Sequence, residues 1–82
     1  MGKEAEYYEL CRSCFLKCDL ENLNTPKNKE LIELALENID KAVELNPSCA
    51  DYYDTRSLIL SFAGYENEAL RDAFIASTLR YP

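Results

Sequence analysis

Residues 52–79 read YYDTRSLILSFAGYENEALRDAFIASTL and contain two amphipathic segments on either side of Gly64. In each segment apolar or small residues recur every three or four positions, which is the period of one face of an α-helix. A helix is expected to follow a capping box at Ser48–Asp51 and to end at Gly64, and another to run from about Glu66 to Tyr81. The buried face of this last helix is expected to consist of Ala69, Leu70, Ala73, Ala76 and Leu79. The stretch therefore predicts a helical hairpin.

The residues before this stretch predict a second hairpin. Its first helix is expected from Lys3 to Asp19, with Tyr7, Cys11, Cys14 and Cys18 on one face. A polar loop follows at about 19–28, and Thr25 and Pro26 are suited to cap and start the next helix, which Pro47 ends. The apolar face of that helix is expected to consist of Leu31, Leu34, Ala35, Ile39, Ala42 and Val43. No strand pattern is present, so the predicted fold class is all-α, with four helices in two stacked antiparallel hairpins.

One offset along the chain places the second helix of the first hairpin on that of the second, with Ala35 on Ala69 and Ala42 on Ala76. In the first helix, Cys11 takes the place of the small Ser57. The join between the helices is longer in the first hairpin than in the second, so the first repeat contains an insertion. The chain is thus expected to be one domain, 1–82, with one repeat over about 3–47 and another over about 48–82.

This period, about 34 residues with two helices in each repeat, resembles that of the tetratricopeptide repeat family. Tyr53, Gly64, Ala69 and Ala76 match its pattern, whereas the insertion in the first repeat departs from it. The resemblance implies a fragment of a right-handed α-solenoid. It also implies a non-catalytic protein-protein interaction module, a scaffold or adaptor, that binds a peptide or helix of a partner protein in a groove lined by the first helices. The partner-binding residues that it implies are Tyr8, Arg12, Phe15, Asp54, Leu58, Ser61 and Phe62.

The composition excludes several other functions. The net charge is −6 and no basic cluster is present, which argues against nucleic acid and anionic membranes as partners. A basic or apolar protein partner is favoured over an acidic one. Histidine is absent and no glycine-rich phosphate loop is present, so no nucleophile-base pair or cofactor motif can be assembled. We therefore expect no enzyme activity and no cofactor.

Four cysteines leave a zinc or thiol-redox protein as a further alternative. Cys11, Cys14 and Cys18 would span about 10 Å of rise on a straight helix, so one zinc ion could not bind all three thiolates. Cys49 is the remaining candidate ligand. We expect the cysteines to act as small apolar residues, with no bound metal. We expect no signal peptide before them and therefore free thiols in a reducing compartment, the cytoplasm or the nucleus.

Two surface features have alternative interpretations. One is an acidic stripe on the second helix, either a docking surface for a basic partner or a solvated face, formed by Glu30, Glu33, Glu37, Asp40 and Glu44. The other is the last helix, which we expect to be uncapped. Its candidate self-association residues are Phe74, Ile75 and Leu79. They predict either a homodimer or a place within a longer array of repeats.

Overall fold

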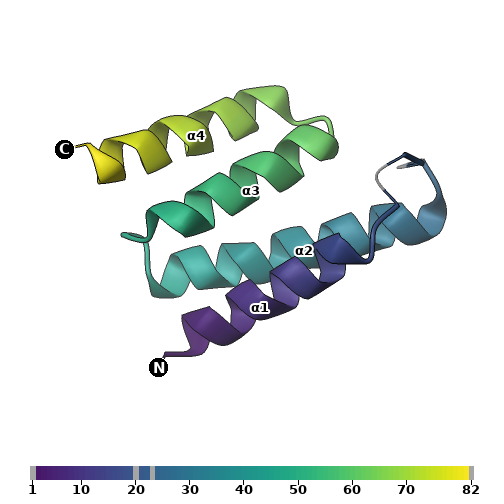
Figure 1. Cartoon of the computed structure of the whole chain (residues 1–82), viewed down its shortest axis with the longest axis horizontal. Helices are drawn as coiled ribbons and strands as arrows, with labels where there is room; N and C mark the ends of the chain where they lie inside the picture. The colour runs from purple at the N-terminus through teal and green to yellow at the C-terminus, as the bar shows by residue number, and fades with distance from the viewer. Residues whose placement is uncertain (1, 20, 23, 82) are drawn as a thin grey trace.

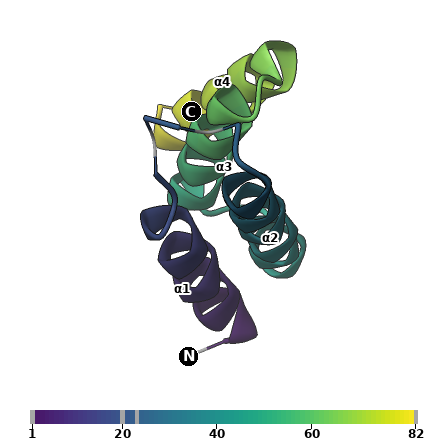
Figure 2. The same cartoon turned by 90° about the vertical axis from the view of Figure 1, so that its right-hand side faces the viewer.

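The computed structural model describes residues 2–19, 21–22 and 24–81 and contains four helices in that part of the chain. They are α1 (Lys3–Leu16), α2 (Pro26–Leu45), α3 (Ala50–Phe62) and α4 (Glu66–Arg80). Helices α1 and α2 pack as one hairpin and α3 and α4 as another, and the second hairpin lies on the first (Figures 1 and 2). The prediction of an all-α fold with two stacked hairpins is confirmed.

The helix ends follow from a few local contacts. The Oγ1 of Thr25 accepts a hydrogen bond from the backbone N–H of Asn28 at 3.2 Å, so this residue caps α2 as predicted. The predicted capping box before α3 is wrong. Cys49 is the N-cap there and has no side-chain capping bond, while the Oδ1 of Asn46 accepts a hydrogen bond from the backbone N–H of Ser48. Helix α1 also ends at Leu16, short of the predicted end at Asp19.

The core lies between α1, α2 and α3. Cys11, Ala35, Ile39, Ala42 and Ile59 are fully buried in it. Small side chains at 35 and 42 let α1 approach α2 closely, and the matching alanines at 69 and 76 are buried under α3 in the second hairpin. The predicted role of these small residues is therefore confirmed.

The predicted apolar faces of α2 and α4 are wrong in part. Leu34 on α2 and Leu70, Ala73 and Leu79 on α4 are exposed. The buried face of α4 contains Asp72 instead, between Ala69 and Ala76. Because Asp72 bonds to Arg56 of α3, the two helices are joined by an ion pair on the side of α4 that was expected to be wholly apolar.

The loop between α1 and α2 is held by one buried amide. The side chain of Asn28 donates to the backbone carbonyls of Asp19 at 3.3 Å and Asn22 at 2.6 Å, and its Oδ1 accepts from the backbone N–H of Asp19 at 3.1 Å. The cost of burying an amide is offset when its donors and acceptors form hydrogen bonds, as those of Asn28 do. The first turn of α2 thus anchors the inserted loop.

Candidate binding surfaces

Four of the seven residues predicted to bind a partner lie at the contact between α1 and α3. The ring centroids of Phe15 and Phe62 are 5.6 Å apart, within the range of favourable aromatic pairs. Tyr8 packs its ring 5.0 Å from that of Tyr52, and the Arg12 guanidinium lies 5.8 Å over the Tyr8 ring. The aromatic contacts of Tyr8 and Phe15 join the two hairpins and so support the fold, whereas the contacts of Arg12 with Tyr8 and Glu9 lie within α1.

The other three predicted residues lie on α3, on the side of α4. Asp54 forms an ion pair with Arg80, whose guanidinium also donates to Asp51 at 2.8 Å. These two carboxylates raise the pKa of Arg80, with the hydrogen bond to Asp54 as the largest cause. Ser61 lies 3.3 Å from a carboxylate oxygen of Glu66. Leu58 is 50% exposed between this charged group and the two phenylalanine rings.

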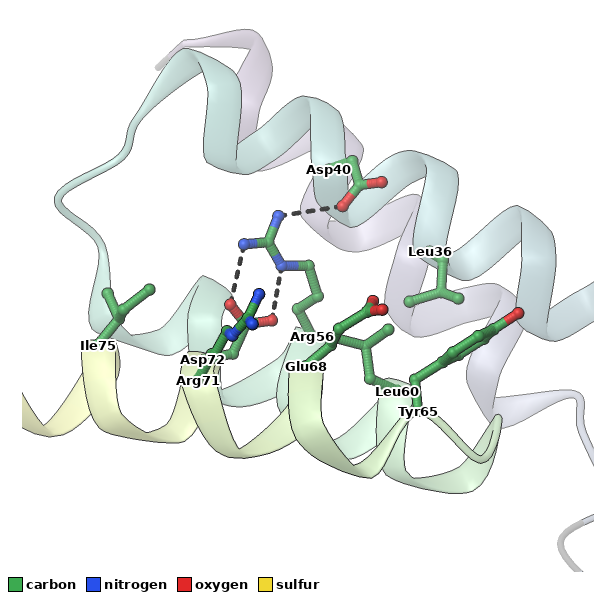
Figure 3. Close-up of a pocket in the computed structure, with 9 residues that line it drawn as sticks. All are labelled: Leu36, Asp40, Arg56, Leu60, Tyr65, Glu68, Arg71, Asp72 and Ile75. Carbon is green, nitrogen blue, oxygen red and sulfur yellow. Dashed lines mark hydrogen bonds and ion pairs between the residues drawn. The ribbon is translucent and has the colours of Figure 1, made fainter.

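A hollow of about 690 Å³ lies on another side of the molecule, between α2, α3 and α4 (Figure 3). At its base, the guanidinium of Arg56 bonds both oxygens of Asp72, with Nε–Oδ2 at 2.8 Å and Nη2–Oδ1 at 2.9 Å. A third bond, from Nη1 to Asp40, measures 3.1 Å. The bonds to Asp72 are the largest cause of a raised pKa at Arg56. The charges at the base of this hollow are thus paired with one another, which indicates a structural role.

Sequence reasoning missed the pair of Arg56 and Asp72, although one signal for it was present. Asp72 lies three residues after Ala69 and four before Ala76, a spacing that places it on the buried face of α4. A carboxylate at such a position needs a cationic partner. The bond to Arg56 gives Asp40, one member of the acidic stripe, a cationic partner. All five members of the stripe are exposed, namely Glu30, Glu33, Glu37, Asp40 and Glu44.

The cysteines lie at the contact between α1 and the rest of the core. All four are free thiols, and Cys11 is fully buried. Burial, and to a lesser extent Cys14 and Asp40, raises the pKa of Cys11 to about 12. Cys14, Cys18 and Cys49 are half-buried and pack against the same cluster. Within residues 2–19, 21–22 and 24–81, no three cysteine or carboxylate side chains gather as a metal ion would require.

The three residues predicted for self-association, Phe74, Ile75 and Leu79, are all exposed on α4. Ile75 lines the hollow beside α2, whereas Phe74 is offset from it by one step of about 100° around α4 and is strongly exposed. Leu79 lies one turn beyond Ile75, on the same side as Ile75. The three side chains thus lie on adjoining sides of α4.

None of the helices described in the structure is both long and apolar enough to cross a membrane.

The chain was compared with known protein families, curated proteins and solved structures. No protein-family model, no curated protein and no solved structure matches this chain.

Proposed function

We propose that this chain is a non-catalytic protein-interaction module, a scaffold or adaptor, built from two tetratricopeptide-like repeats. The sequence repeat that pairs Ala35 with Ala69 and the stacking of the two hairpins support the proposal. Its binding surface would be the side of α1 and α3 that contains Leu58, and its ligand a short extended or helical segment of a partner protein.

The observation that carries the proposal is that Leu58 is exposed between an aromatic pair and an ion pair. Asp54, Leu58 and Phe62 follow at intervals of four positions and so lie along one side of α3. Phe62 and Phe15 provide aromatic surface at one end, and the ion pair of Asp54 with Arg80 provides charge at the other. An apolar centre with a charged rim is typical of protein interfaces.

The charge of the chain favours an apolar or basic segment as the ligand over an acidic one. Asp51 and Asp54 remain exposed beside Leu58 although Arg80 binds both. Together with the net charge of −6, they would attract lysine and arginine side chains and repel carboxylates. The free cysteines support a reducing compartment, the cytoplasm or nucleus, as the place of action.

A display library of short random peptides, panned against the full chain, tests the proposal. Enriched peptides are expected to combine leucine or phenylalanine with lysine or arginine. Their affinity, measured by fluorescence anisotropy, is expected to fall at least about tenfold with Leu58→Ser, since an apolar contact at the centre of an interface is worth about 1.4 kcal/mol or more. Arg12 lies exposed beside the same surface, so Arg12→Glu is expected to change the affinity for these charged peptides.

Leu45→Ser is the matched control, because Leu45 is similarly exposed but lies at the end of α2. Circular dichroism of each variant checks that the helices are retained. Peptides that bind wild type, Leu58→Ser and Arg12→Glu with equal affinity would contradict the proposed surface. A library that yields no binder would contradict the proposed function itself.

A further inference from the structure

The four most exposed large apolar side chains of the described residues lie at the two ends of the helical stack. Tyr81 is 80% exposed, Leu16 77%, Phe74 73% and Leu70 67%. Leu16 is on α1, and the other three are on or directly after α4, so they occupy the two outer helices of Figure 1. Apolar patches of this kind in a small domain mark association surfaces.

The contact between α2 and α3 provides a template for how these ends could be covered. The repeat offset that places Ala35 on Ala69 also places α2 on α4. A second, larger offset places α1 on α3, because it brings Cys11 onto Ser57 and Leu16 onto Phe62, the last residue of each helix. Every contact between α2 and α3 can therefore be translated into a contact between α4 and the α1 of another molecule.

Three contacts of the template translate onto these exposed residues, onto the exposed Leu10 and onto Tyr7, which is half-buried. Leu36 and Phe62 line the same small hollow, and their equivalents are Leu70 and Leu16. Asp40 and Arg56 form an ion pair in the template, and their equivalents are Phe74 and Leu10, which are both apolar and exposed. The hydroxyl of Tyr53 donates to the carbonyl of Pro47, and their equivalents are Tyr7 and Tyr81. The described part of the chain thus contains apolar residues suited to both halves of such a contact.

A hollow on α1 agrees with this translation. It is lined by Gly2, Ala5, Glu6, Glu9, Leu10 and Ser13. The offset that places α1 on α3 brings Glu6 onto Tyr52 and Ser13 onto Ile59, and both of these α3 residues are buried against the first hairpin. The open side of α1 therefore corresponds to the side of α3 that is buried against the first hairpin.

We propose that a second copy of this chain binds head to tail, with its α1 covering Leu70, Phe74 and Tyr81 of the first copy as α3 covers α2. Such a contact joins two different surfaces, so it leaves one end of each copy free and adds further copies without closing. Of the predicted self-association residues Phe74, Ile75 and Leu79, this contact uses Phe74. Asp54 lies at both this contact and the proposed peptide-binding surface, but Leu58 takes no part in the contact, so changes at Leu58 distinguish the two.

The charges around this contact predict how the association between copies depends on salt. The pair of Tyr8 with Tyr52 translates into Asp54 of one copy and Glu6 of the next, and the bond of Tyr8 with Thr55 into Asp54 and Glu9. Arg80 neutralises Asp54 only in part, because it also binds Asp51. Since salt screens repulsion between exposed carboxylates, association is expected to strengthen as sodium chloride is raised from about 0.1 to 1 M.

Sedimentation velocity on the full, reduced chain over a concentration series tests the proposal. The wild type is expected to form species larger than a dimer at high concentration and high salt. Leu70→Ser/Phe74→Ser blocks the α4 side and Leu10→Ser/Leu16→Ser blocks the α1 side, so each variant alone is expected to be a monomer. A mixture of the two is expected to form a one-to-one dimer that grows no further, because one intact pair of surfaces remains. Leu45→Ser and Leu58→Ser are controls that should associate as the wild type does.

Two results would overturn the proposal. One is a wild type that stays monomeric at every concentration and salt level. The other is self-association of the Leu10→Ser/Leu16→Ser variant, since a symmetric contact between two α4 helices would survive that change. Circular dichroism checks that both double variants fold, and they are expected to do so because all four side chains are exposed. Loss of peptide binding by Leu58→Ser with unchanged association would separate this contact from the proposed function.

Discussion

The replacement Arg56→Met is expected to destabilise the fold by about 3 kcal/mol. Methionine keeps the apolar stem of the side chain but removes three hydrogen bonds, two to Asp72 and one to Asp40. The side chain of Asp72 is only 6% exposed, so water cannot replace the lost partner. Breaking a buried ion pair in this way costs about 3–5 kcal/mol, and we take the lower end because one fifth of the Arg56 side chain is exposed.

This loss is large for so small a domain. At roughly 0.05–0.15 kcal/mol per residue, a chain of 82 residues has a free energy of unfolding of about 4–12 kcal/mol. Urea unfolding followed by far-ultraviolet circular dichroism measures the change. All variants are compared in the Leu70→Ser/Phe74→Ser background, so that association does not add to stability.

Two further variants distinguish the buried pair from the exposed one. Asp40→Asn removes a carboxylate that is more than half exposed and is expected to cost less than about 1 kcal/mol. Arg56→Met/Asp72→Leu removes both buried charges and is expected to be more stable than Arg56→Met alone. The reasoning is refuted if Arg56→Met lies within about 0.5 kcal/mol of its parent, the range of ordinary surface changes, or if Asp40→Asn costs as much as Arg56→Met.

Three other changes test separate features. Asn28→Ala is expected to lower the free energy of unfolding by about 1–3 kcal/mol, because Asp19 and Asn22 lose hydrogen bonds to a buried amide; urea unfolding measures it, and no loss would contradict the anchoring role. Gly64→Ala is expected to cost about 1–2 kcal/mol in the same assay from backbone strain alone, because φ is +92° there and no atom lies within 4 Å of an added methyl group. Burial raises the pKa of Cys11 from 9.0 to about 12, so the unfolded thiol ionises first. The stability that this shift contributes is complete below pH 9 and is lost as the pH rises toward 12, and the stability of Cys11→Ala, measured by urea unfolding, is expected to fall less steeply over that range.

Helix positions and the close contacts could be predicted from the sequence because they depend on local patterns. Thr25 with Pro26 is a capping signal that needs no tertiary information, and the alanines at 35, 42, 69 and 76 recur at the repeat period. These features follow from spacing alone, and the structure confirms them.

The surfaces could not be predicted in the same way, since they depend on how the hairpins are stacked. Leu70 belongs to the apolar pattern of α4, but nothing in the described part of the chain lies over it, because α3 packs on another side of α4. Phe15 and Phe62 were predicted to bind a partner, and their rings contact each other across the two hairpins. Periodicity identifies a helix face, whereas its neighbour in space is set by packing between repeats.

The order in which the helices pack has a consequence for folding kinetics. Each helix makes its main contacts with the helix before or after it in the chain, α1 with α2, α2 with α3 and α3 with α4. Short sequence separation between contacting residues lowers the entropy lost before the first contacts form, so such chains fold in microseconds to milliseconds. The contacts of Tyr8 with Tyr52 and Thr55 join residues far apart in the sequence and are expected to form last. A substitution at Tyr8 should therefore accelerate unfolding while leaving the folding rate almost unchanged.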